Sequence, residues 1–146
     1  MSDKRSAVTA WEALFRAQVA VVRQLGSEFP VHGLSLKEYD VLFNLSRQPE
    51  QRLRIRDLNR HLLLSQPSVS RMVDRLATRG LVAKEADPGD GRGTIVCLTD
   101  KGMELFRRAA AVHAASIHQV VGSALTREEL ETLTRLSDKL RLGAKG

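Results

Sequence analysis

Residues 65–81, SQPSVSRMVDRLATRGL, contain the clearest structural signals in the chain. Ser65 is a good N-cap, and Pro67 falls in the first helical turn, where its missing backbone N–H costs nothing. An apolar stripe follows at helical spacing: Val69, Met72, Val73 and Leu76. Gly80 suits the left-handed position just beyond a last turn. The pattern predicts an amphipathic helix over residues 65–79.

The outward face of this predicted helix carries side chains that suit the edges of DNA bases. At 100° per residue, Arg71 points away from the apolar stripe, and Ser70 and Arg75 flank it. Four further candidates lie at the N-cap and in the first turn: Ser65, Gln66, Pro67 and Ser68. Arginine can pair with guanine and glutamine with adenine, and each pairing is worth about 1–3 kcal/mol of discrimination. We interpret this face as the part of a recognition helix that enters the major groove.

Shorter elements are predicted on both sides of the recognition helix. A helix that carries Leu58 and Leu62 precedes it. Two β-prone runs, residues 81–85 and 94–98, follow it, and residues 87–93 between them are rich in turn-forming residues. The pattern predicts a helix-turn-helix followed by a β-hairpin wing with a mobile tip. An arginine near that tip, Arg92, could enter the narrow minor groove.

Positive charge is concentrated in this central region. Nine cationic and five acidic side chains lie between residues 52 and 92, a net charge of +4 against +6 for all 146 residues. Arg54 belongs to this set and is a further candidate DNA contact. An isolated helix pair with surface arginines is just as consistent with an ordinary solvated face. The hairpin that follows favours double-stranded DNA as the partner, because it places a second cationic element beside the first.

Amphipathic helices are also predicted outside the central region. Apolar residues recur at three- and four-residue steps from residue 7 to residue 29. Further helix starts are indicated by an N-capping residue, Ser35, Thr99 or Thr126, and at two of these a glutamate three residues later completes a capping box. The terminal helices are richer in large apolar residues than a small winged helix needs, which predicts dimerisation.

The expected fold is therefore mainly α with a small β-hairpin wing, an α+β winged helix-turn-helix with N- and C-terminal dimerisation helices. We expect residues 35–99 to form the DNA-binding lobe. Residues 1–34 and 100–146 should form the helical dimerisation region of the same intertwined domain.

Five motifs carry a resemblance to a known family. They are Leu58 to Leu62, the segment 65–76, Arg79-Gly80-Leu81-Val82, Asp87 through Arg92, and Leu98-Thr99-Asp100-Lys101-Gly102. In this order, over nearly the whole chain, they resemble the MarR family of bacterial regulators. The resemblance implies a homodimer whose paired winged helices straddle a palindromic operator. It also implies that Asp90 forms a salt bridge with Arg92 and so orients Arg92 for the minor groove.

The resemblance further implies a ligand-responsive repressor with a small-molecule pocket where the first two helices meet the DNA-binding lobe. Candidate ligand contacts there are Trp11, Arg16 and Tyr39, because aromatic walls and one cation suit a small aromatic or phenolic acid. The simpler interpretation, which we prefer, is that Trp11 and Tyr39 are core or dimer-interface residues and that Arg16 is solvated. An effector would act by changing the separation of the two recognition helices.

Other regulatory chemistry has weaker support in the sequence. Cys97 lies in the apolar run 95–98, where a thiol usually packs as a small hydrophobe. His113 and His118 are five residues apart, about 140° around a helix, which is poor geometry for a shared metal. The two other histidines, His32 and His61, stand alone. We expect no metal and no cofactor, and keep a metal- or redox-sensing regulator and a winged-helix protein-interaction module as alternatives.

Several classes of protein are not expected. A single cysteine excludes an intrachain disulfide framework and fits a reducing compartment such as the cytoplasm. The chain has no apolar run of the roughly 20 residues needed to span a bilayer, and residues 1–5 lack the start of a signal peptide. Neither a Gly-x-Ser-x-Gly elbow nor a Cys/His/Asn arrangement is recognisable, so an enzyme is not expected.

Overall fold

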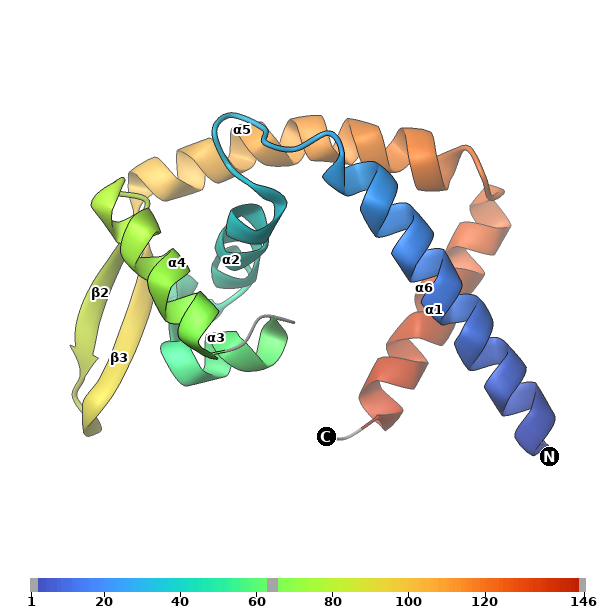
Figure 1. The fold of residues 1–146 in the computed structure, drawn as a ribbon, viewed down its shortest axis with the longest axis horizontal. Coiled ribbons are helices and arrows are strands. Elements are labelled where there is room, and N and C mark those ends of the chain that lie inside the picture. The colour runs from blue at the N-terminus through green and yellow to red at the C-terminus, as the bar shows by residue number, and fades with distance from the viewer. Residues whose placement is uncertain (1–2, 63–65, 145–146) are drawn as a thin grey trace. The chain divides into compact units, whose positions relative to one another are not determined.

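The computed structural model describes residues 3–62 and 66–144 and divides into two compact units (Figure 1). One unit comprises the chain up to residue 28 and from residue 113 onward, and the other comprises residues 29–112. Helix α5, Asp100–Ile117, contributes to both units. The remaining elements of the second unit are α2 (Leu36–Ser46), η1 (Pro49–Gln51), β1 (Arg52–Arg54), α3 (Ile55–His61), α4 (Gln66–Thr78), β2 (Val82–Asp87) and β3 (Asp90–Leu98).

The second unit packs three short helices and the start of α5 against a three-stranded antiparallel sheet. The strand order is β1-β3-β2, so the central strand β3 pairs with both others. The core consists of apolar side chains with almost no exposed surface: Leu34, Val41, Leu42, Leu45, Leu58, Val69, Val73, Leu76, Leu81 and Val96. A mainly helical fold with a small sheet confirms the predicted fold class.

Helix α4 ends as the sequence predicts, at a glycine. Gly80 has a φ of +76°, its N–H donates to the Ala77 carbonyl at 2.9 Å, and the Leu81 N–H donates to the Leu76 carbonyl at 3.0 Å. These two bonds form a Schellman motif, which satisfies the last carbonyls of the helix. The predicted N-cap, Ser65, lies outside the described residues.

The start of α5 is fixed against the end of α4. The Thr99 hydroxyl donates to the Gly80 carbonyl at 2.7 Å and accepts the Gly102 N–H at 3.0 Å. A Cβ at residue 102 would lie 2.0 Å from the Leu81 carbonyl oxygen, so only glycine fits there. The predicted cap at Thr99 is confirmed.

The strands of the β-hairpin extend further than the sequence predicts, because they include residues 87 and 90–93, which were expected to belong to the turn. Asp87 pairs with Asp90, which leaves a turn of Pro88 and Gly89, while Ala86 pairs with Thr94. Residues 91–93 therefore bulge from the ladder. The physical reason is that the Asp87 side chain accepts the Gly89 N–H at 2.9 Å and closes the turn locally.

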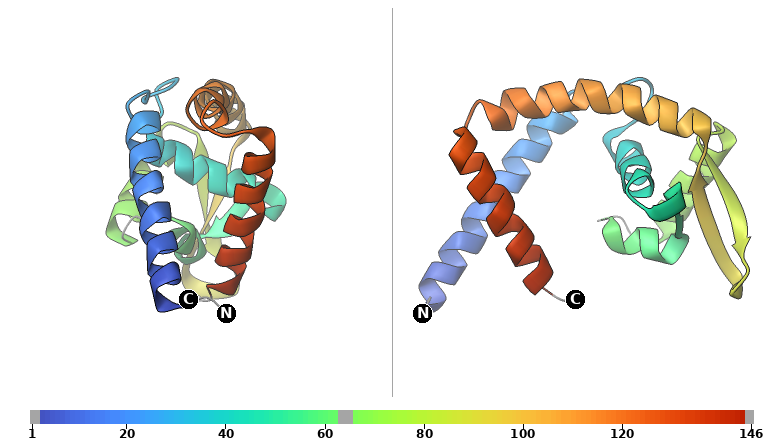
Figure 2. Two further views of the ribbon diagram at one scale, coloured as in Figure 1. Left: turned by 90° about the vertical axis from the view of Figure 1, so that its right-hand side faces the viewer. Right: turned by 180° about the vertical axis from the view of Figure 1, so that it is seen from behind.

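Within its described residues, the first unit contains helical elements and no strand. Its elements are α1 (Lys4–Gly26), the end of α5, the π-helical turn η2 (His118–Gly122) and α6 (Arg127–Gly143). Both α1 and α6 extend away from the end of α5 (Figure 2). Thr126 and Glu129 form the predicted capping box at the start of α6. Most large apolar side chains of this unit remain exposed.

Candidate nucleic-acid interface

Helix α4 has one buried and one exposed face, as its sequence predicts. Val69, Val73 and Leu76 have no exposed surface. On the other side, Pro67, Arg71 and Arg75 are exposed, and Ser68 and Ser70 are half-buried. The predicted candidate Gln66 is the first residue of α4, but its side chain lies outside what the structure describes.

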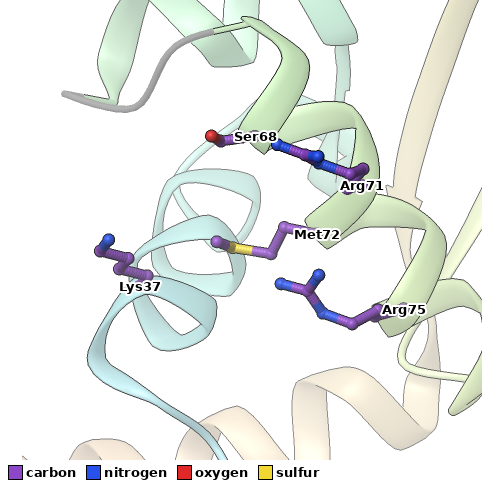
Figure 3. Close-up of a pocket in the computed structure, with 5 residues that line it drawn as sticks. All are labelled: Lys37, Ser68, Arg71, Met72 and Arg75. Atoms are coloured by element: carbon purple, nitrogen blue, oxygen red, sulfur yellow. The ribbon is translucent and has the colours of Figure 1, made fainter.

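A concave pocket of about 330 Å³ lies between α4 and α2 (Figure 3). Its walls carry three cations, a hydroxyl and a thioether, from Lys37, Arg71, Arg75, Ser68 and Met72. Lys37 comes from the first turn of α2, and the Met72 side chain extends from α4 toward it. The sequence pattern does not indicate Lys37, because its proximity to α4 depends on how the two helices pack. What the sequence does show is that Lys37 lies two residues after the Ser35 cap, in the first turn of a predicted helix.

The cations around α3, α4 and the hairpin fall into two groups. Five are matched to carboxylates by ion pairs: Arg52 with Glu85, Arg54 with Asp87, Arg60 with Asp57, Arg79 with Glu38, and Lys84 with Asp74. Over the described parts of the chain, five others around α4 and the hairpin form no ion pair: Lys37, Arg56, Arg71, Arg75 and Arg92. The second group gives this surface its uncompensated positive charge.

The hairpin tip does not contain the ion pair that the family resemblance implies. The Asp90 Oδ1 atom accepts the backbone N–H of Arg92 at 3.1 Å, and no ion pair joins these two described side chains. An aspartate readily bends back to the backbone two residues on, which explains the preference. The Arg92 side chain is exposed.

Arg54, a predicted DNA contact, is paired within the protein. Its Nε lies 2.6 Å from Oδ2 of Asp87. A second pocket, of about 220 Å³, lies where the start of α3 meets the hairpin, and its lining includes Arg54, Arg56, Asp87, Asp90 and Arg92. Arg56 is a further cation at this site, and the sequence pattern does not distinguish it from the other arginines. Figure 1 places the hairpin tip and the first turn of α4 on the same side of the unit.

The three predicted ligand contacts are divided between the two units. Trp11 is 58% exposed and lies 5.7 Å from the Phe15 ring, and Arg16 is exposed on the same helix. Tyr39 is buried in the second unit, where burial raises the pKa of its hydroxyl and the charge of Asp40 adds to the effect.

Aromatic rings surround Tyr39 in the second unit. The Phe106 ring is centred 5.2 Å away, the Phe29 ring 5.7 Å away and the Phe43 ring 6.5 Å away. The Arg47 guanidinium lies over Phe43, 5.3 Å from its centroid.

The residues considered for redox or metal sensing do not form a built site. Burial raises the pKa of the half-buried Cys97 thiol, and Glu85 raises it further, so the reactive thiolate is disfavoured. Burial lowers the pKa of His113, with Glu28 acting in the opposite direction. Across residues 3–62 and 66–144, no three His, Cys, Asp or Glu side chains are grouped so as to hold a metal ion. None of the described helices is both long and apolar enough to cross a membrane.

Comparison with known proteins decides the family. A family model described as MarR family matches residues 32–93. Over 132 aligned residues the chain is 31% identical to the HTH-type transcriptional regulator MhqR of Bacillus subtilis (strain 168). The aligned region covers 90% of this chain and 89% of MhqR. The chain belongs to the MarR family. It is a DNA-binding transcription regulator and not an enzyme, as the sequence predicts.

Solved structures of other DNA-binding proteins share the fold. Sco3205 from Streptomyces coelicolor, determined in complex with DNA, superposes with a TM-score of 0.79 at 26% identity, covering 100% of this chain and 92% of that one. BpsR of Bordetella bronchiseptica, whose DNA binding is regulated by 6-hydroxynicotinic acid, gives a TM-score of 0.75 at 26% identity, covering 91% and 98%.

Proposed function

We propose that this MarR family protein is a ligand-responsive repressor that binds a pseudo-palindromic operator as a homodimer. In this proposal α4 enters the major groove and the β2–β3 hairpin reaches the adjacent minor groove. The observation that carries it is a set of exposed arginines on α4 and the hairpin: Arg71, Arg75 and Arg92 form no ion pair within the described residues, whereas the neighbouring cations Arg52, Arg54, Arg79 and Lys84 are each matched to a carboxylate. Uncompensated exposed arginines favour a polyanion.

The exposed residues of α4 divide naturally between bases and backbone. Arg71 lies near the start of the helix, with Pro67, Ser68 and Ser70, and is proposed to recognise base edges. The sequence assigns Ser65 and Gln66 to the same role. Two cations of the α2–α4 pocket, Lys37 and Arg75, are proposed to bind flanking phosphates, because they lie on two different helices around one hollow.

A homodimer is supported by the apolar surface of the first unit. Its large apolar side chains with at least 43% exposure are Val8, Trp11, Phe15, Val22, Leu133, Leu136, Leu140 and Leu142. Burying apolar surface contributes about 25 cal/mol per Å², so a second copy that covers these side chains would be strongly favoured. We propose that the two recognition helices then meet half-sites about one helical turn apart.

We propose a small aromatic or phenolic acid as the effector. The regulation of BpsR by 6-hydroxynicotinic acid supports this class of ligand. Trp11, Arg16 and Tyr39 remain the candidate contacts from the sequence. The structure adds Phe43, which is 36% exposed beside Tyr39, and Arg47 above its ring, a combination suited to an aromatic carboxylate.

The test begins by selecting bound duplexes from a random pool and titrating the best one at several salt concentrations. Arg71→Ala should relax base preference by about 1–3 kcal/mol, whereas Arg92→Ala should weaken binding more evenly across sequences. Arg107→Ala removes the same charge from an exposed site on α5 and should leave selectivity unchanged. If both α4 and hairpin variants bind the selected duplex like the wild type, the proposal is wrong.

The effector is tested on the same complex. Small aromatic acids should release the operator, and Arg47→Ala should raise the concentration needed without changing operator affinity in their absence. Release that is equally effective in Arg47→Ala would remove Arg47 from the proposal.

A further inference from the structure

Asp87, at the end of β2, is the one buried charged side chain among the described residues, with 4% of its surface exposed. Its Oδ2 atom lies 2.6 Å from Nε of Arg54, and its Oδ1 atom accepts the Gly89 N–H at 2.9 Å. Arg54 is the last residue of β1, and its side chain is 43% exposed. Because a buried carboxylate without a partner is strongly destabilising, this pair ties the hairpin to β1.

The same carboxylate lies against Gly93, the last residue of the bulge at residues 91–93. A Cβ at Gly93 would lie 3.2 Å from Cβ of Asp87 and 3.4 Å from its Oδ2. Arg92 is the middle residue of the bulge, and its N–H is held by Asp90. The backbone that carries Arg92 is therefore packed on Asp87 at Gly93, the residue that follows Arg92.

We propose that Arg54 and Asp87 are positioning residues for Arg92: their ion pair holds the bulge in the shape that presents Arg92 to DNA. In this role Arg54 neutralises Asp87 and not a phosphate. The inference rests on the proposed function, since it requires the hairpin to contact DNA.

Direct contact and positioning give opposite expectations for Asp87→Asn. If Arg54 bound a phosphate, removing the negative charge of Asp87 would free the guanidinium and tighten DNA binding. If the pair positions Arg92, the asparagine has only one oxygen for two donors, the Gly89 N–H and Nε of Arg54. When its oxygen accepts the Gly89 N–H, its NH2 group faces Nε of Arg54, and when the amide is turned round, the contact with Gly89 is lost. The bulge then loosens, and affinity falls although the protein has become more positive.

The experiment measures operator affinity by fluorescence anisotropy at one salt concentration, with thermal unfolding of each variant. Arg92→Ala should weaken binding about tenfold, and Asp87→Asn should lose most of the same factor. The matched control is Glu104→Gln, which makes the same charge change at an exposed position on α5, outside the hairpin. It should bind as tightly as the wild type or more tightly.

A second pair of variants keeps the test decisive if Asp87→Asn does not fold. Arg54→Gln should weaken binding several-fold in the wild-type background but by less than about twofold in the Arg92→Ala background, because positioning acts only through Arg92. Equal losses in both backgrounds would show that Arg54 contacts DNA itself and would overturn the inference. So would unchanged or tighter binding by folded Asp87→Asn.

The failure of the proposed function looks different. If Arg92→Ala leaves operator affinity unchanged, the hairpin does not contribute to DNA binding, and both the role of the hairpin and the positioning inference fall. If Arg92→Ala weakens binding while Asp87→Asn and the Arg54→Gln cycle behave as direct contact predicts, only the positioning inference falls.

Discussion

Arg75 and Arg79 lie one turn apart at the end of α4, yet the structure predicts different consequences for replacing them. Arg79 forms an ion pair with Glu38 at 3.5 Å, and the two side chains are 38% and 15% exposed. Arg75 lines the α2–α4 pocket and forms no ion pair within the described residues. We expect Arg75→Ala to change DNA binding and Arg79→Ala to change stability.

The size of each effect follows from these surroundings. If Arg75 binds one phosphate per protomer, its loss from the proposed dimer makes the log–log dependence of affinity on salt less steep by about 1.8. The ratio of wild-type to variant affinity should then shrink about 12-fold between about 50 and 200 mM salt. Arg79→Ala should leave this slope unchanged and cost at most about 1 kcal/mol of folding stability, because its ion pair is partly exposed.

The assay is an anisotropy titration of the selected operator at four or more salt concentrations, with thermal unfolding of both variants. Equal slopes for Arg75→Ala and the wild type would refute the assignment of Arg75 to a phosphate. If Arg79→Ala also changed the salt dependence of affinity, an ion pair within the protein would not exclude a cation from binding DNA, and the two groups of cations would lose their meaning.

Three further predictions concern the scaffold. Gly102→Ala should lower stability by about 3 kcal/mol, since its Cβ would meet the Leu81 carbonyl oxygen at 2.0 Å, whereas Gly143→Ala, with nothing within 4 Å, should have little effect on the thermal midpoint. Burial raises the pKa of Asp40 above 3.8, so the ionised carboxylate opposes folding. Asp40→Asn should therefore raise the thermal midpoint at pH 7, and this gain should disappear as the pH falls below 3.8. A difference in midpoint that does not change with pH would contradict burial as the cause. Leu136→Asp, at a half-exposed position on α6, should shift the protein toward monomer in sedimentation, and a fully dimeric variant would exclude Leu136 from the interface.

The helices were predictable because their signals are local. The capping box of Ser35 and Glu38, with hydrogen bonds of 2.9 and 3.1 Å, and the left-handed Gly80 depend on residues within one helical turn. The buried stripe of α4 follows from 3.6-residue periodicity alone. The residues that face outward on α4 were predictable for the same reason.

The hairpin was predicted less well, because its turn depends on a choice among several aspartates and glycines close together. The sequence places Asp87 and Asp90 near Arg92 but does not say which carboxylate accepts which donor. The structure pairs Asp87 with Arg54, a residue 33 positions earlier, and gives Asp90 a backbone partner. The prediction of an ion pair between Asp90 and Arg92 was therefore wrong.

By itself, then, the sequence determined the starts of α2, α5 and α6, the outward face of α4 and the membership of a DNA-binding family, since these depend on short-range periodicity, caps and motifs. Only the tertiary structure decided which cations are available to a polyanion. Arg54 and Arg79 are neutralised by carboxylates distant in sequence, while Lys37 is brought to the same hollow as Arg75. The strength of an ion pair falls as the distance between the two charges grows, and the order of residues in the sequence does not specify the distances between residues far apart in the chain.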